Sequence, residues 1–183
     1  MTPKAKLFWP ACVLSFATDM ATKLWVDASL GFADRITVIE GFFYITHVRN
    51  PGAAFGLFNS APAALRLTAF IGITLVAIAM IFSFYRRLAP GERLSALSLG
   101  LILGGAGGNL VDRVFRGEVV DFLHFRLWRG YQWPDFNLAD SFIVVGVALL
   151  VIELLASEGE KSANPAGAAS EPAAELSSPP SRD

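Results

Sequence analysis

The feature that most limits what this chain can fold into is residues 67–85 (LTAFIGITLVAIAMIFSFY), a stretch without a single charged side chain. A helix needs about 20 mostly apolar residues to cross the hydrocarbon layer of a bilayer. Of the chain's 183 residues only 17% are charged, whereas about a quarter are charged in a typical soluble domain. The sequence therefore predicts a membrane protein. Its net charge of −1 offers no electrostatic basis for binding nucleic acid.

Three further stretches are expected to cross the bilayer. Residues 94–111 and 137–156 are mainly apolar, although Asp140 lies near the start of the second stretch. The stretch 5–26 is the least convincing of the three, because it carries charged side chains in its second half. Together with 67–85, these stretches predict four transmembrane helices.

The charges in the first stretch, Asp19 and Lys23, are compatible with a helix that crosses the bilayer. They are spaced i, i+4, so they share one helix face and can pair, which lowers the cost of inserting them. A secretory signal peptide is the alternative, since Lys4 and Lys6 precede an apolar core. However, the charged pair stands where a cleavage site requires small residues. We therefore expect a retained helix.

Basic residues around the predicted helices indicate the orientation. Those on the side of the termini are Lys4, Lys6, Arg86, Arg87 and Arg93, and those on the opposite side are Arg35, Arg49, Arg113, Arg116, Arg126 and Arg129. The numbers are balanced, but the dense arginines after 67–85 and the basic N-terminus favour a cytoplasmic location of both termini. On the opposite side, arginines mixed with aromatic residues in 114–136 predict an amphipathic outer loop in the headgroup layer.

The remaining segments predict a single domain followed by a tail. In the other outer segment, 27–66, the β-branched and aromatic runs 36–39 and 42–48 predict a short hairpin. Residues 157–183 are rich in Ala, Ser, Pro and Glu and predict a disordered cytoplasmic tail. The expected fold is an all-α membrane protein, in which residues 1–156 form four transmembrane helices, a small extracytoplasmic β-hairpin or sheet, and the amphipathic loop.

Acidic residues cluster at the outer ends of the predicted helices, where ionisable groups are costly and are therefore candidates for function. Asp140 opens the fourth helix, and Asp121 lies in the outer loop between apolar neighbours. Because this loop joins adjacent antiparallel helices, it can bring Asp121 beside Asp140. Two carboxylates held close together share a proton, so one acts as an acid and the other as a base. Such a pair can activate water against a peptide bond without a metal ion.

Structural roles for the same residues remain open. If Asn137 caps the fourth helix, Asp140 occupies position N3, where a negative charge suits the helix dipole. Asp121 alone could be an ordinary loop acid, and Asp112 and Arg113 could form an ion pair that ends the third helix. A small proton-coupled transporter or channel would use the same charges, but it predicts an internal repeat, which the sequence lacks. A structural membrane subunit predicts that neutral replacement of the acids is harmless.

Neither a metal site nor a disulfide framework is expected. His47 and His124 are far apart in the sequence and show no metal-ligand spacing. Cys12 is the single cysteine, which excludes an internal disulfide. The glycines of 104–109 do not follow a strand, so they predict close helix packing rather than a nucleotide site.

Several motifs of this chain, taken together and in order, resemble the lipoprotein signal peptidase family, also called signal peptidase II. They are DMATK (19–23), NPGAAFG (50–56), GGAGGNLVDR (104–113), VVDF (119–122) and FNLAD (136–140). The resemblance covers nearly the whole chain apart from the tail. One departure is Gly107, which stands where the family often has a larger apolar residue.

The resemblance implies an intramembrane aspartic endopeptidase of the bacterial cytoplasmic (inner) membrane, with Asp121 and Asp140 as the catalytic pair near the outer face and no cofactor. It implies cleavage of prolipoproteins just before the diacylglyceryl-modified cysteine of the lipobox, so the expected partners are lipid-modified precursors and membrane lipids. The positions that match the polar and small residues around the family's site are Asn50, Gly52, Ala53, Asn109, Arg113 and Asn137. The positions that match its supporting ion pairs are Asp19, Lys23 and Asp112.

Overall fold

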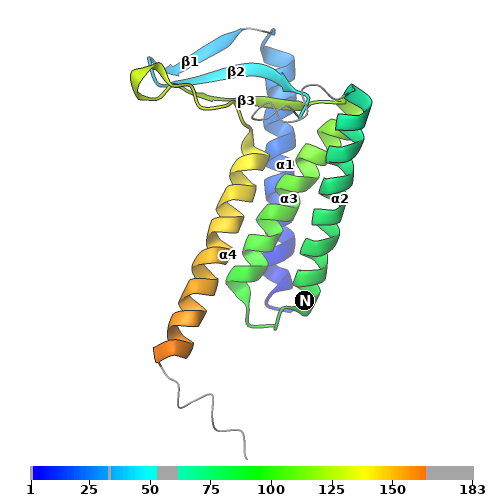
Figure 1. The fold of residues 1–183 in the computed structure, drawn as a ribbon, viewed down its shortest axis with the longest axis vertical. Helices are drawn as coiled ribbons and strands as arrows, with labels where there is room; N and C mark the ends of the chain where they lie inside the picture. Colours follow the sequence, from blue (N-terminus) through cyan, green and yellow to red (C-terminus); the bar gives the residue numbers. More distant parts are fainter. Residues whose placement is uncertain (1, 33, 53–61, 164–183) are drawn as a thin grey trace, which may run out of the picture.

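The structure, a computed structural model, describes residues 2–32, 34–52 and 62–163, with side chains described up to residue 156. Within them the chain forms, in order, α1 (Ala5–Ser29), β1 (Arg35–Ile39), β2 (Phe43–Asn50), α2 (Ala63–Arg87), α3 (Arg93–Arg116), β3 (Val119–Phe125), the short 3-10 helix η2 (Trp128–Gly130) and α4 (Leu138–Ala163). The helices run side by side, and the strands lie across one end of them (Figure 1). The described chain is thus mostly helical, with one small antiparallel sheet.

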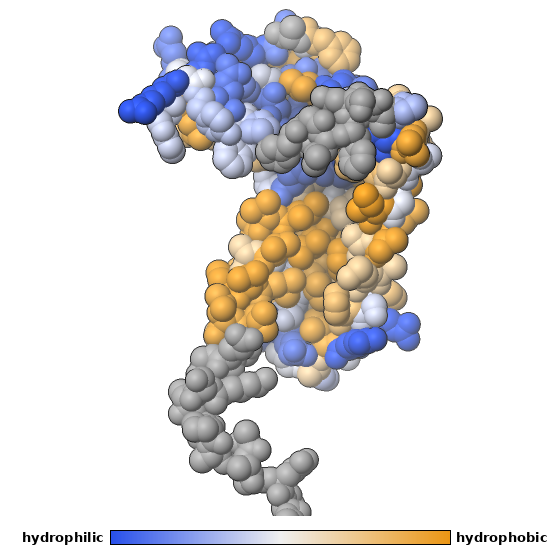
Figure 2. Space-filling model, in the orientation of Figure 1, coloured by the Kyte–Doolittle hydropathy of each residue, from blue (hydrophilic) through white to orange (hydrophobic). Residues whose placement is uncertain are grey.

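The surface of the helices is that of a membrane-embedded bundle. Figure 2 shows apolar side chains over the middle of the helices, and polar side chains on the sheet and at the opposite end. Among the described helices, α2, α3 and Leu138–Ala156 of α4 are long and apolar enough to cross a bilayer. α1 is as long as α2 but differs in composition, because Asp19 and Lys23 lie in its second half.

Small residues of α3 allow the other helices to approach closely. A Cβ atom added at Gly104 would overlap Ser15 of α1, and one added at Gly108 would overlap the carboxylate of Asp19. On the other side of α3, a Cβ at Gly105 would press against the backbone of Ala139 in α4. The glycine-rich stretch therefore serves helix packing, as the sequence predicts, since small residues let backbones approach in a membrane.

The predicted hairpin is confirmed, and it is part of a larger sheet. β1 pairs with β2 and β2 with β3, both antiparallel. A bulge interrupts β2 between Ile45, which is paired with Leu123, and Val48, which is paired with Asp121. Beneath the sheet, Val120 packs into an apolar cluster that includes the end of α1. This packing fixes β3 above the helices.

The third strand was not predicted, because an amphipathic loop was expected over the whole of 114–136. Part of this segment is β3, and η2 follows it. The run Val119–Phe125 has no polar–apolar alternation, because its first half is buried on both faces. Such a strand shows no period-two pattern in the sequence. The exposed Trp128 is the first residue of η2, and the exposed Tyr131 directly follows η2.

At the other end of the chain, α4 runs past residue 156, where the domain was predicted to end, and continues to Ala163. Residues 164–183, the larger part of the predicted disordered tail, lie outside the described residues. The tail therefore stays a prediction.

Candidate active site

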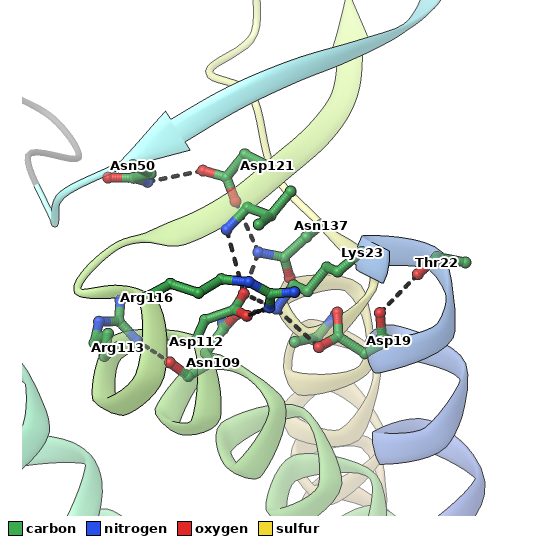
Figure 3. Close-up of polar contacts among 12 residues, drawn as sticks. Asp19, Thr22, Lys23, Asn50, Asn109, Asp112, Arg113, Arg116, Asp121 and Asn137 are labelled. Atoms are coloured by element: carbon green, nitrogen blue, oxygen red, sulfur yellow. Dashed lines mark hydrogen bonds and ion pairs between the residues drawn. The ribbon is translucent and has the colours of Figure 1, made fainter. Parts of the chain in front are cut away.

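Asp121 lies in β3 and is almost completely buried, with 1% of its surface exposed. Asn50, the last residue of β2, donates a hydrogen bond from Nδ2 to Asp121 Oδ2 at 2.8 Å, and Asn137 Nδ2 donates to Asp121 Oδ1 at 2.7 Å (Figure 3). Burial raises the pKa of Asp121 to about 7; the hydrogen bonds from the two amides oppose this rise, and the charge of Asp140 adds to it. The carboxyl group of Asp121 can therefore hold a proton near neutral pH.

Asp140 lies in the first turn of α4 and forms a reciprocal cap with Asn137. The Asp140 N–H donates to Asn137 Oδ1 at 3.1 Å, and the Asn137 N–H donates to Asp140 Oδ2 at 3.3 Å. The predicted N-cap is thus confirmed. Because the side chain of Asn137 also binds Asp121, a single residue contacts both carboxylates. The structure brings the two predicted acids together around Asn137.

Asn109 of α3 connects Asp140 to a buried lysine of α1. Asn109 Nδ2 donates to Asp140 Oδ1 at 2.8 Å, and Asn109 Oδ1 accepts a hydrogen bond from Lys23 Nζ at 2.8 Å. The same oxygen accepts a weaker hydrogen bond from Asn137 Nδ2 at 3.2 Å. Since a lysine can only donate, it fixes which end of the Asn109 amide points toward Asp140.

Lys23 lies between two carboxylates, and all three side chains are fully buried. Its Nζ is 2.8 Å from Asp19 Oδ2 and 3.0 Å from Asp112 Oδ2. Asp19 Oδ1 also accepts a hydrogen bond from the Ala139 N–H at 2.9 Å, which ties α1 to the start of α4 (Figure 3). These buried charges are tolerable because they are paired and hydrogen-bonded. The three residues predicted as ion pairs therefore form one cluster beneath the acids.

The remaining predicted residues lie nearby. Gly52 has φ +88°, and its N–H donates to Asn50 Oδ1 at 2.9 Å, which leaves the Asn50 amide nitrogen for Asp121. The guanidinium of Arg113 lies over the ring of Phe70, 5.3 Å from its centre, and donates to the Asn109 carbonyl oxygen at 3.2 Å. Ala53 lies outside the described residues.

A second charged cluster, around Asp27, was not predicted from the sequence. Its carboxylate contacts Arg49 and His47 of β2 and Arg116 of α3. A signal was present, because Asp27 follows Asp19 and Lys23 at the same four-residue spacing, which places all three on one face of α1. In the part of the chain that the structure describes, no group of three His, Cys, Asp or Glu side chains could hold a metal ion.

The chain is similar to a known family over most of its length. The family model described as signal peptidase (SPase) II matches residues 11–156. A lipoprotein signal peptidase from Geobacter metallireducens is 44% identical over 88% of this chain and 98% of its own length. A lipoprotein signal peptidase from Geobacter sulfurreducens is 43% identical over 88% of this chain and 99% of its own length.

Two solved structures, both described as bacterial membrane enzymes, share the fold. The one solved at 1.9 Å resolution has a TM-score of 0.70 and 34% sequence identity, and the match covers 79% of this chain and 90% of that chain. The one solved at 2.3 Å has a TM-score of 0.71 and 31% identity, and the match covers 91% and 92%. On the strength of the family match and of these relatives, the chain belongs to the signal peptidase II family.

Proposed function

We propose that this chain removes the signal peptide from prolipoproteins as an aspartic endopeptidase, cutting before the diacylglyceryl-modified lipobox cysteine. The names of the Geobacter relatives support the substrate class. The observation that carries the aspartic mechanism is that Asn137 binds Asp121 through its side chain and Asp140 through its backbone. Two carboxylates so arranged can share the work of acid and base on one water molecule.

In the proposed mechanism Asp140 is the base and Asp121 is the acid. The negative charge of Asp140 is favoured by the start of α4 and by the hydrogen bond from Asn109. The pKa of Asp121, raised by burial, favours a proton there. Asp140 takes a proton from water as the water oxygen bonds to the scissile carbon, and Asp121 donates its proton to the carbonyl oxygen. Asp140 then passes its proton to the leaving nitrogen as the C–N bond breaks, and Asp121 recovers its own.

Small and polar residues of the same region suit an extended substrate. A bilayer provides no water for the substrate backbone, so side-chain amides such as that of Asn50 are the groups that can bind it. Gly52 leaves room beside Phe70, because a Cβ atom at this position would overlap the phenyl ring. In this proposal Asn50, Asn109, Asn137 and Arg113 surround the substrate, whereas Asp19, Lys23 and Asp112 support them.

We also propose that residues 1–156 form one membrane peptidase domain with four transmembrane helices. Family membership and the apolar helices support a multi-pass protein of the bacterial inner membrane. The finer proposal is that both termini are cytoplasmic, which places the acids near the outer face, where exposed Trp128 and Tyr131 suit the headgroup layer. No feature of the described residues favours the alternative of a transporter or channel.

The test is incubation of the purified protein with a precursor peptide that carries the diacylglyceryl group on its lipobox cysteine, scored by mass. We expect a product that begins with the lipid-modified cysteine, and no product from the same peptide without the lipid. Asp121→Asn and Asp140→Asn should each abolish cleavage while leaving the protein folded. Retained turnover by both folded variants would refute the aspartate pair, and an intact lipidated precursor with the unaltered protein would refute the peptidase.

A further inference from the structure

The carboxylate of Asp27, near the end of α1, contacts side chains from both β2 and α3. Arg49 Nη2 of β2 lies 2.7 Å from Asp27 Oδ1, and Arg116 Nη2 of α3 lies 2.9 Å from Asp27 Oδ2. The ring of His47 in β2 also contacts Oδ1, at 3.1 Å, and its other nitrogen lies 2.8 Å from the carbonyl oxygen of Leu30. Both oxygens of Asp27 are therefore engaged by cationic or hydrogen-bonding groups from different elements.

Each arginine leads to a residue next to the candidate active site. Arg49 directly precedes Asn50, which donates to Asp121. On the other side, Arg116 Nη1 contacts Asp112 Oδ1, and Asp112 Oδ2 accepts a hydrogen bond from the Val120 N–H at 3.2 Å (Figure 3). Val120 directly precedes Asp121. Asp27 is thus connected to the residues that directly precede Asn50 and Asp121, whose side chains form a hydrogen bond between β2 and β3.

These connections converge on one rung of the sheet. Arg49 and Val120 are paired residues of β2 and β3, and this rung lies just past the bulge of β2. A bulge disrupts the ladder locally, and a shift of one residue would turn Asp121 to the opposite face of the sheet. Contacts from outside the sheet can therefore stabilise the register beyond the bulge. The Asp27 network makes such contacts with β2 through Arg49, and with β3 through Arg116 and Asp112.

We propose that Asp27 is a positioning residue, which holds Asn50 and Asp121 in register through its two arginines. This inference rests on the proposed peptidase function and adds a residue outside its acid pair. An amide cannot replace the carboxylate here, because its NH₂ group would face one of the guanidiniums, which only donate. The negative charge itself is therefore what the position requires.

Asp27→Asn is the first test, with Asp34→Asn as the matched control. Asp34 is an exposed acid of the same outer segment, and it accepts a hydrogen bond from the Gly31 N–H. We expect Asp27→Asn to lower kcat for the lipid-modified precursor by up to about 100-fold, since small displacements of a catalytic group have effects of this order. The loss in kcat should exceed any rise in KM, because Asp121 belongs to the acid pair, whereas the displaced Asn50 also lies beside the substrate in the proposed function. Asp34→Asn should match the unaltered protein.

The pH profile of kcat distinguishes positioning from general loosening. The charged groups that act on Asp121 are Asp140 of α4, Lys23 of α1 and Arg113 of α3. The hydrogen bond from Asn50 lowers the pKa of Asp121, so its loss in Asp27→Asn should raise that pKa. If Asp121 must be protonated, the high-pH limb of kcat then moves to higher pH. Asp27→Glu, which keeps the charge, should restore most of kcat and move the limb back.

Arg49→Gln extends the test in case Asp27→Asn does not fold. The Arg49 side chain is only a quarter exposed, so its replacement has to preserve packing. Glutamine keeps most of the aliphatic stem and leaves the contact between Asp27 and Arg116 intact. The proposal expects the same direction of change in kcat and in the pH limb. A folded Asp27→Asn or Arg49→Gln protein with the kcat and pH profile of Asp34→Asn would overturn it. If instead the unaltered protein fails to cleave the precursor, the proposed function fails, and the two outcomes are distinguishable.

Discussion

Three asparagine side chains hold the two acids, and each has its amide oriented by a group on its far side. The oxygen of Asn50 accepts from the Gly52 N–H, that of Asn109 from Lys23, and that of Asn137 from the Asp140 N–H. The three NH₂ groups consequently all point at carboxylates. This is a preorganised arrangement, because no amide has to turn before the acids are bound. The buried cluster beneath the acids thus serves their geometry as well as the packing of the helices.

The raised pKa of Asp121 predicts a pH-dependent stability. The folded state holds a proton on Asp121 between the ordinary value of 3.8 and about 7, where the unfolded chain has released it. The folded state therefore loses stability as pH rises through this window, and the loss is complete above it. Asp121→Asn cannot titrate, so its melting temperature should fall less between these pH values than that of the unaltered protein.

Thermal unfolding in detergent at several pH values measures this difference. Asp34→Asn is the control, since it removes an exposed acid of the outer segment without touching β3. Its melting curve should follow that of the unaltered protein with pH. Parallel pH slopes for Asp121→Asn and the unaltered protein would contradict the raised pKa. The absolute stability of Asp121→Asn is not the readout, because Asn50 and Asn137 both donate to this side chain.

Replacing Lys23 should have a large effect on stability, although its side chain touches neither Asp121 nor Asp140. Lys23→Met would leave Asp19 and Asp112 fully buried without their shared cation. Breaking such a buried pair typically costs about 3–5 kcal/mol. We expect the free energy of unfolding to drop by this order, as measured by chemical denaturation in detergent. In the double variant Lys23→Met/Asp19→Asn, one uncompensated charge is removed and part of the loss should be regained; a double variant as unstable as the single one would argue against charge pairing.

At the scale of elements, α3 offers a matched pair of glycines. A Cβ at Gly108 would overlap Asp19, whereas one at Gly107 meets the ring of Phe16 at an ordinary 3.4 Å. Gly108→Ala should therefore destabilise the protein and separate α1 from α3. Gly107→Ala should be tolerated and can gain up to about 1 kcal/mol, because alanine is the better helix former. Melting temperatures of the two variants test this, and equal losses would contradict the assignment of close packing to Gly108.

The elements show which parts of the fold a sequence can predict. The helices and the hairpin were predictable, because each leaves a local mark: apolar length for the helices and β-branched runs for β1 and β2. The cap of α4 was predictable for the same reason, since Asn137 and Asp140 are three residues apart. The strand β3 was not, because its pairing with β2 joins residues about 70 positions apart, such as Asn50 and Val119.

The candidate site divides in the same way. Its acids and asparagines were named from motifs, whereas the contacts of Asp27 were not, because they join the end of α1 to β2 and to the end of α3. A charge at the edge of a predicted helix has many partners within reach in an unfolded chain. Only the assembled bundle brings Arg49 and Arg116 to the same carboxylate. The sequence shows which residue types are present, but it does not show which distant residues pair with one another.

At the scale of the whole molecule, α1 decides the number of membrane crossings. Lys4 Nζ donates to the carbonyl oxygen of Tyr85 at 3.2 Å, so the start of α1 lies beside the end of α2. The far end of α1 packs against β3, so α1 extends along the bundle from one end to the other. Its Asp19 and Lys23 neutralise each other away from lipid. α1 can therefore cross the bilayer despite its charges.

If α1 crosses the bilayer, the start of the chain lies on the same side of the membrane as the end of α2 and on the opposite side from the sheet. In a Cys12→Ala background, single cysteines at Thr2, Glu40 and Arg87 can be labelled with a membrane-impermeant maleimide, before and after cell lysis. Glu40→Cys, in the turn between β1 and β2, should be labelled in intact cells whose outer membrane has been permeabilised. Thr2→Cys and Arg87→Cys should be labelled only after lysis, because both positions lie at the other end of the bundle. If α1 did not cross the bilayer, Thr2→Cys would react like Glu40→Cys, and the protein would have three crossings with its N-terminus outside.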